Sequence, residues 1–231
     1  MTKGGAGRVY GGLTAENRQL QRRESLIEAG LHLFGTLGYP NVSVKRICAE
    51  AGLTQRYFYE SFGDRAALLG EVYNHCVETA RDATLAAAAK ALADIEIADG
   101  PIPDDVVPGL TEQALRGFIS SLTEDTRRAR IIMIEVVGVS PELEELRLRA
   151  IHRWADLILG FASRGHEPTA DQRLGAIGLV GALTQLLVEW QTAHQAPIEP
   201  GYDVELLDID AIHRVVTGTF VATYRQLFHA D

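Results

Sequence analysis

The residues best suited to chemistry in this sequence lie in one short segment, 43–62, which reads SVKRICAEAGLTQRYFYESF. Gln55, Arg56 and Tyr59 share one face of a short helix there, and Phe58 lies on the opposite, apolar face. A guanidinium group can donate two hydrogen bonds to guanine, and an amide can bond adenine in the same two-point manner. The segment therefore predicts a helix that binds base edges in the major groove of DNA.

Two short helices and a tight turn must position these side chains. Ser43 is a good N-cap for a helix over 44–51, and Gly52, which has no Cβ, permits the positive φ of a sharp turn. Thr54 is expected to cap a second short helix that ends near Ser61. Together these elements predict a helix-turn-helix.

The rest of the chain also has helical periodicity. A helix over 16–37 completes a three-helix N-terminal head, and a long fourth helix over 65–94 joins the head to a larger region. Further helices are expected at 110–124, 126–137, 141–164, 170–194 and 204–228. Loops are expected at 97–109 and 196–203, which are rich in proline and glycine. With no strand pattern or internal repeat, the sequence predicts an all-α protein of about nine helices.

The pattern divides the chain into three regions. Residues 1–15 are rich in glycine and predict a flexible arm. Residues 16–65 form the expected helix-turn-helix DNA-binding domain. Residues 66–231 form the expected larger helical domain.

The net charge differs between the head and the rest of the chain. The whole chain has 22 Lys and Arg against 31 Asp and Glu, a net charge of −9, which taken alone argues against a partner that is a polyanion. Residues 1–65 carry nine basic and six acidic side chains, a net charge of +3, whereas residues 66–231 carry 13 and 25, a net charge of −12. A basic head on an acidic body fits DNA binding by the head alone.

Composition and motifs exclude several other classes. The two cysteines, Cys48 and Cys76, rule out a disulfide framework and favour the cytoplasm. The longest apolar stretch, 174–188, is shorter than a membrane span, so no membrane partner is expected. No metal-site, P-loop or nucleophile-elbow pattern occurs, so we expect no enzyme, no metal and no cofactor.

Residues 22–69 resemble the DNA-binding head of the tetracycline-repressor (TetR) family of transcriptional regulators. The resemblance rests on Phe34 with Gly38-Tyr39, Ser43 with Ile47-Cys48, Ala51-Gly52-Leu53-Thr54, Tyr59 with Phe62, and Arg65 with Leu68-Leu69. It implies that the second short helix is the recognition helix and that its N-terminal residues contact bases. It also implies that Tyr59, Ser61 and Arg65 contact the backbone of the DNA. Arg56 and Tyr57 replace residues that are commonly small, so no base preference carries over. Arg65 replaces the usual lysine and keeps its charge.

The residues expected to bind DNA combine the helix-turn-helix pattern with this resemblance. Lys45 and Arg46 are added as candidates for phosphate contacts, and the alternative is that they are ordinary solvated charges on an exposed helix face. The complete set is Ser43, Lys45, Arg46, Thr54, Gln55, Arg56, Tyr57, Tyr59, Ser61 and Arg65. The basic residues Lys3, Arg8, Arg18, Arg22 and Arg23 either follow the DNA backbone or solubilise the N-terminal end of the chain.

Small residues on the last two helices predict a close helix crossing. Glycine destabilises a helix by about 0.5–1 kcal/mol relative to alanine, so its repetition at every third position needs a packing reason. We expect these helices to pair with their copies in a two-fold, four-helix homodimer interface, as the resemblance also implies. The interface residues are Gly175, Gly178, Gly181, Ala182, Gly218 and Ala222. A contact within one chain is the alternative.

Between the head and this interface, the resemblance implies an effector pocket within the middle helices. A buried polar side chain needs a partner, and a ligand can be one. The candidate residues are Phe118, Met133, Glu135, Val136, His152, Trp154, Phe161, Gln185, Glu189 and Trp190. Apolar residues at helical spacing are more often part of an ordinary core than of a pocket.

The sequence thus predicts a ligand-responsive DNA-binding transcriptional regulator, a repressor that binds a pseudo-palindromic operator as a dimer. The expected effector is an unknown, largely apolar small molecule that releases the protein from double-stranded DNA. A regulator without an effector, controlled by a protein partner, is the alternative. A helical enzyme is the remote one.

Overall fold

The computed structural model describes residues 15–93, 102–163, 166–195 and 208–228, and this part of the chain is helical without strands. The predicted all-α class is confirmed. The α-helices are α1 (Ala15–Leu37), α2 (Val44–Glu50), α3 (Gln55–Ser61), α4 (Arg65–Ala93), α5 (Val107–Thr123), α6 (Thr126–Arg130), α7 (Pro141–Ala162), α8 (Ala170–Gln195) and α9 (Ile209–Phe228). Two other helical turns are η1 (Tyr39–Asn41), a 3₁₀ turn, and η2 (Ile131–Glu135), a π-helical turn.

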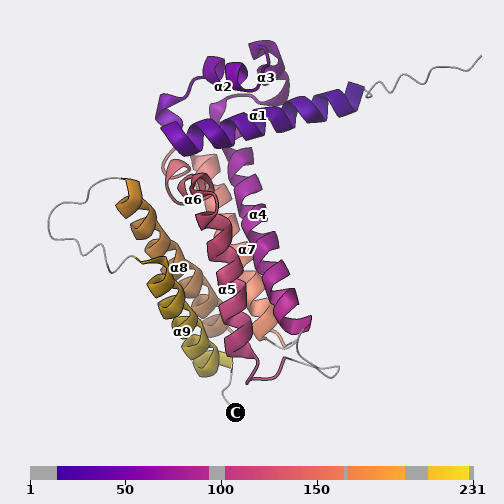
Figure 1. Cartoon of the computed structure of the whole chain (residues 1–231). Helices are drawn as coiled ribbons and strands as arrows, with labels where there is room; N and C mark the ends of the chain where they lie inside the picture. The colour runs from indigo at the N-terminus through magenta and orange to yellow at the C-terminus, as the bar shows by residue number, and fades with distance from the viewer. Residues whose placement is uncertain (1–14, 94–101, 164–165, 196–207, 229–231) are drawn as a thin grey trace, which may run out of the picture.

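The helices α1 to α3 form a head at one end of the molecule (Figure 1). The long helix α4 leaves this head and runs along α5 and α7, while α8 and α9 lie on the side of α5 away from α4. Side-chain caps begin several helices. The Ser140 hydroxyl accepts a hydrogen bond from the Leu143 amide at the start of α7. Asp64 accepts one from the Ala67 amide at the start of α4.

The hydrophobic core of the head continues into the body. Phe34, Ile47 and Phe58 are fully buried, and they belong to one cluster with Leu69 and Val72 of α4. The same cluster includes the body residues Ile131, Val136, Leu143 and Ala150. The head is therefore seated on the start of α4, on η2 and on α7.

A close contact between α4 and α5 fixes one wall of the body. A Cβ atom added to Gly117 would lie 2.7 Å from the Ala83 carbonyl oxygen and 2.7 Å from the Ala87 Cβ. Only glycine therefore allows the two helix backbones this approach. A second cluster, which includes Phe118, Leu122 and Leu187, joins α5 to α8 and α9.

Two predicted boundaries differ from the structure. The loop expected to reach residue 109 ends earlier, because α5 begins at Val107 with Pro108 in its first turn. Proline is tolerated there, since its missing amide hydrogen would have no partner inside the helix. The helix expected over 126–137 divides into α6 and the π-helical η2. The arm, the 196–203 loop and the expected start of the last helix at residue 204 lie outside the described residues.

The apolar helix α8 is long and apolar enough, by length and composition alone, to cross a membrane over Ala170–Ala193. In the structure it packs against α7 and α9. Leu187 and Ala176 on this helix are almost fully buried. One side of α8 therefore packs into the body, whereas Leu174 and Ile177 stay exposed.

Candidate nucleic-acid interface and ligand cavity

The turn between α2 and α3 has the geometry that a helix-turn-helix requires. Gly52 has a φ of 65°, a conformation that residues with a Cβ rarely adopt. The Leu53 amide donates to the Cys48 carbonyl at 2.8 Å, which closes the turn. The Ser43 hydroxyl accepts from the Arg46 amide and caps α2, as predicted. Thr54 is the N-cap residue of α3, but its side chain makes no capping hydrogen bond.

Helix α3 is held to the head by its apolar face. Phe58 is fully buried and Phe62 nearly so, with ring centroids 5.9 Å apart. The opposite face carries Gln55, Arg56 and Tyr59, all of them exposed. Since α3 lies at the end of the molecule away from α8 and α9, this face is open to a large partner (Figure 1).

Glu60 holds the Arg56 side chain in place. The Arg56 Nε donates to Glu60 Oε1 at 2.8 Å, and this hydrogen bond is the main cause that raises the pKa of Arg56. The guanidinium group stays 83% exposed. Because Glu60 accepts a hydrogen bond only from Nε of Arg56, the terminal nitrogens Nη1 and Nη2 of Arg56 can donate to a base or a phosphate.

The remaining predicted contacts divide into exposed and packed side chains. Lys45 and Arg46 at the start of α2 are exposed, as are Ser43 and Thr54, and Ser61 is half-buried at the end of α3. Tyr57 is half-buried because the Arg22 guanidinium of α1 lies 4.5 Å from the centre of its ring.

Arg65 makes contacts inside the head. Its Nη1 donates to the Tyr39 carbonyl at 3.2 Å and to the Val42 carbonyl, and its guanidinium lies 4.7 Å from the centre of the Tyr39 ring. Arg65 therefore ties η1 to the start of α4. Arg23 has a similar internal role, because it pairs with Glu71 at 2.9 Å and lies over the Phe62 ring.

A large apolar cavity opens in the body. It has a volume of about 460 Å³ and lies among α4, α5, α7, α8, α9 and η2. Its volume is in the range of sites for small molecules. Five of the ten residues predicted for an effector pocket line it: Phe118, Met133, Trp154, Phe161 and Gln185. Phe118 and Trp154 meet edge to face, with ring centroids 5.1 Å apart.

The other five predicted pocket residues lie elsewhere. Glu135 and Val136 are buried where the body meets the head. His152 is exposed on α7, beside a shallow depression that it lines with Arg149 and Arg153. Trp190 is buried in the core cluster of α5, α8 and α9, and Glu189 accepts a hydrogen bond from Gln185 Nε2 at 2.8 Å. Apolar spacing in the sequence does not distinguish these positions from the cavity wall.

Sequence reasoning missed several polar residues of the lining, among them Tyr73 and Arg147 at the end beside the head. Tyr73 is 2% exposed, and burial raises the pKa of its hydroxyl to about 12. Arg147 is half-buried, and its Nε and Nη2 donate to Glu144 Oε2 at 3.1 and 3.0 Å. The only signal in the sequence was a tyrosine on an otherwise aliphatic helix face.

A buried ion pair joins the body to the head. Glu135 Oε2 accepts from the Tyr39 amide at 2.6 Å, and Glu135 Oε1 accepts from Arg130 Nε at 2.6 Å. Arg130 Nη1 in turn donates to the Thr36 carbonyl at the end of α1. The partners of Glu135 are thus supplied by the protein itself.

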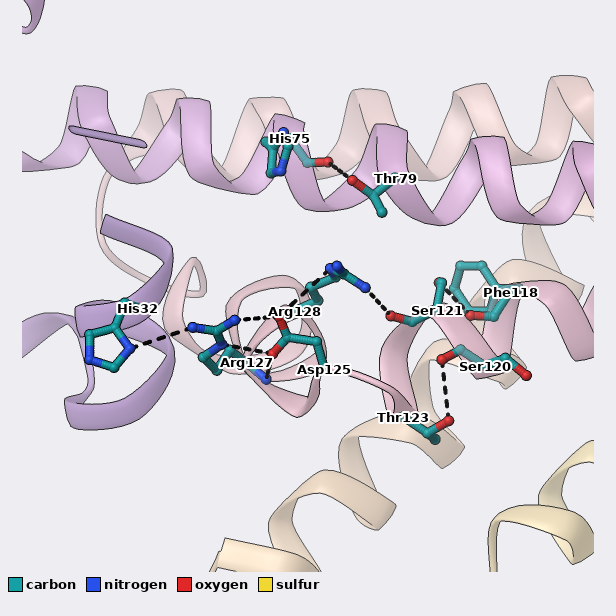
Figure 2. Close-up of polar contacts among 10 residues, drawn as sticks. All are labelled: His32, His75, Thr79, Phe118, Ser120, Ser121, Thr123, Asp125, Arg127 and Arg128. Carbon is teal, nitrogen blue, oxygen red and sulfur yellow. Dashed lines mark hydrogen bonds and ion pairs between the residues drawn. The ribbon is translucent and has the colours of Figure 1, made fainter. Parts of the chain in front are cut away.

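A second contact connects α1 to α6 beside this ion pair. Figure 2 shows Arg127 between His32 of α1 and Asp125, to which it donates from Nε at 2.8 Å and from Nη2 at 2.7 Å. These hydrogen bonds hold the pKa of Asp125 below its usual value. A Cβ added to Gly35 would lie 2.5 Å from the Arg127 Cβ, so α1 and α6 touch closely.

The small residues of α8 and α9 lie mostly on an open face. An added Cβ on Gly178, Gly181 or Gly218 would meet no atom of the chain within 4 Å among the described residues. Ala182 and Ala222 are exposed, as are the larger residues Leu174, Ile177 and Val215. Gly175 differs, because an added Cβ there would collide with Leu227 of α9 in the same chain. Its small size is explained without a partner.

Residues 26–72 match the family model of bacterial regulatory proteins of the tetR family. This match runs from the middle of α1 through α2 and α3 to the start of α4. A search of curated proteins by sequence finds no match to the chain.

Solved structures match the chain over most of its length. The regulator of fatty acid degradation FadR from Bacillus halodurans is 16% identical, with a TM-score of 0.59 over 85% of this chain and 95% of that one. FadR from Bacillus subtilis in complex with stearoyl-CoA is 16% identical, with a TM-score of 0.58 over 85% and 98%. A tetR-family regulator from Streptomyces coelicolor is 17% identical, with a TM-score of 0.61 over 90% and 80%. At these identities the likeness shows a shared fold.

Proposed function

We propose that this chain, whose residues 26–72 form the amino-terminal domain of the tetR family of bacterial regulatory proteins, is a cytoplasmic repressor released from its operator by a small molecule. The observation that carries the proposal is the exposed face of α3. Gln55, Arg56 and Tyr59 project from a helix whose other face is fixed by Phe58. A short helix that is held to the head by one face and exposed on the other fits the major groove, and its exposed side chains can bond to base edges.

Binding requires two heads. One short helix contacts few base pairs, whereas two heads about 34–36 Å apart contact a pseudo-palindrome. The open face of α8 and α9, with Gly178, Gly181, Ala182, Gly218 and Ala222, is our candidate for the homodimer interface. The exposed Leu174 and Val215 beside these residues favour burial against a second copy.

The apolar cavity favours control by a small molecule over control by a protein partner. A packed body would have left no space for a ligand, whereas about 460 Å³ lies among five helices and η2. A structurally similar regulator, FadR from Bacillus subtilis, is described in complex with stearoyl-CoA. We therefore place the effector of this chain in the cavity.

The η2 turn links the cavity to the head in this mechanism. Ile132 and Met133 line the cavity, and Glu135 of the same turn is bonded to the Tyr39 amide in the head. A π-helical turn carries an additional residue that packing must hold, and such turns are frequent at functional sites. A ligand that prefers a different arrangement of η2 would shift the population toward a head spacing that does not fit the operator. A nearly complete switch needs an affinity ratio of about 10⁴ between the two arrangements.

Selection of bound sequences from random DNA tests the proposal. The purified chain is expected to enrich one pseudo-palindromic motif. Arg56→Ala is expected to weaken discrimination at one position of each half-site by about tenfold or more. Arg116→Ala is the matched control, because Arg116 also pairs with a glutamate one turn away but lies on α5. Unchanged discrimination in Arg56→Ala, or no enriched motif for the wild-type chain, would refute the assignment of α3.

A further inference from the structure

The lining of the cavity extends along several turns of two helices. On α4 its lining runs from Tyr73 to Ala88, and on α7 it runs from Arg147 to Ala162. Each pair is fifteen residues apart, which corresponds to about 22 Å along a helix. An extended chain advances about 1.2 Å per bond, so this length admits about 18 bonds. The volume of about 460 Å³ agrees, since it holds about 15 groups of about 30 Å³ each.

The middle of the cavity offers a ligand little to bond with. The Thr84 hydroxyl donates to the Ala80 carbonyl at 2.7 Å, and the Thr184 hydroxyl donates to the Val180 carbonyl at 2.7 Å. Both groups are satisfied within their own helices. At the end away from the head, the Tyr224 hydroxyl donates to Asp104 Oδ1 at 2.9 Å. Most other lining residues there are aliphatic or aromatic, so this length of the cavity suits a hydrocarbon chain.

The end beside the head is different. The Tyr73 side chain is 2% exposed, and its hydroxyl makes no hydrogen bond with the described part of the chain. A hydroxyl without a partner in the wall of a largely apolar cavity can bond to a polar group of a ligand. Arg147 lines the same end, where Glu144 takes its Nε and Nη2 and leaves Nη1 to donate. Both groups offer donors, so they suit an acceptor oxygen.

We propose that the cavity takes one long-chain acyl molecule, with its carboxylate or carbonyl oxygen at Tyr73 and Arg147 and about 15 to 18 carbon atoms extended toward Ala88. The regulatory role of this ligand rests on the proposed function, whereas its binding to the cavity does not depend on DNA. The free acid and its coenzyme A thioester share the chemistry that the cavity recognises. The experiment distinguishes between them.

The first experiment measures affinity against chain length. Saturated fatty acids of 8 to 20 carbons, and their coenzyme A thioesters, are titrated into the full chain. Trp154 lines the cavity against Phe118, so its fluorescence reports occupancy. Affinity is expected to rise about fourfold per methylene and to stop rising near 15 to 18 carbons. Ala88→Leu adds three carbons at the far end, and it is expected to shorten the preferred chain by about three carbons.

The second experiment tests the polar end. Tyr73→Phe removes only the unpaired hydroxyl and is expected to lower the affinity for hexadecanoic acid or its thioester about fivefold to tenfold. Thr84→Val is the matched control, because its hydroxyl is bonded to its own helix, and it is expected to leave ligand affinity unchanged. Binding by only one of the two compounds identifies the form of the acyl group.

Three results would overturn the inference: no binding of any chain length, affinity independent of chain length, or equal affinities of Tyr73→Phe and the wild-type chain. None of these results contradicts the proposed function as a DNA-binding regulator if the chain still selects an operator. Conversely, acyl binding with the predicted length limit, but without an effect on operator binding, would support the inference and refute ligand control.

Discussion

Removal of the Glu135 carboxylate should detach the head from η2. In Glu135→Leu, the Tyr39 amide loses its acceptor, and Arg130 loses the partner of its Nε. The glutamate side chain is only 6% exposed, so water cannot easily replace it. Removal of one partner of a buried ion pair costs about 3–5 kcal/mol. Arg130 is 23% exposed and keeps the Thr36 carbonyl, which reduces our expected loss to about 2–4 kcal/mol.

Urea unfolding followed by circular dichroism measures this loss as a shift of the midpoint at constant slope. In a chain of this size, each kcal/mol corresponds to about 2–4 °C in Tm, so thermal unfolding should shift by about 4–16 °C. Glu135→Gln keeps one acceptor oxygen and should lose less than Glu135→Leu. Adding Arg130→Met to the leucine variant should restore part of the loss, because no unpaired charge remains.

Glu145→Leu is the control, since Glu145 is 71% exposed and pairs with Arg149 on the surface of α7. Such a pair contributes about 0.5 kcal/mol or less. If Glu135→Leu destabilises the chain no more than Glu145→Leu does, the buried ion pair does not hold the head, and the proposed route through η2 is refuted.

Three further predictions concern dimerisation, stability at acid pH and stability at alkaline pH. Gly178→Ala has room within the chain, so it should raise monomer stability by about 0.5–1 kcal/mol but weaken the dimer in light scattering. Gly160→Ala on α7 is its control, and dimerisation unchanged in both variants would contradict the interface. The lowered pKa of Asp125 means that its contribution to stability is present above about pH 4 and is lost as pH falls through the folded-state pKa. The urea midpoint of Asp125→Asn should therefore lie below that of the wild type at pH 7 and approach it near pH 3, whereas a constant gap would refute this. Burial raises the pKa of Cys76 to about 12, so its contribution is present below pH 9 and is lost as pH rises toward 12. Cys76→Ala should flatten that alkaline decline in the urea midpoint, and an unchanged slope would show that other groups cause it.

The head follows from local signals in the sequence, whereas the cavity does not. Ser43, Gly52 and Phe58 each have a role that depends on a few neighbouring residues, and each takes that role in the structure. A cavity instead depends on the distance between helices. Gly117 brings α4 against α5, and helical spacing alone does not indicate where such approaches leave a gap.

Polar residues were the least predictable. The position of Glu135 among apolar residues in the sequence predicted that a ligand would bond to its carboxylate. In the structure Arg130 and the Tyr39 amide donate hydrogen bonds to that carboxylate. Those partners lie at the end of α6 and in the head, 5 and 96 residues away along the chain, and Glu135 itself lies on a π-helical turn. The sequence IIMIE is equally compatible with an ordinary α-helix, so no local sequence signal predicts the π-helical turn. Tyr73 presents the opposite case, since its side chain lies in the core cluster of the head although its hydroxyl makes no hydrogen bond with the described residues.

The shared core of head and body limits how this protein can be recombined with its relatives. A chimera joined at residue 65 would part Phe34 and Phe58 from Leu69 and Val72, which complete the same cluster. Even a junction placed after Val77 would leave Ile131, Val136 and Leu143 to be matched by the recipient body. If α3 binds the operator as proposed, grafting its exposed side chains therefore disturbs the core less than transplanting the whole head.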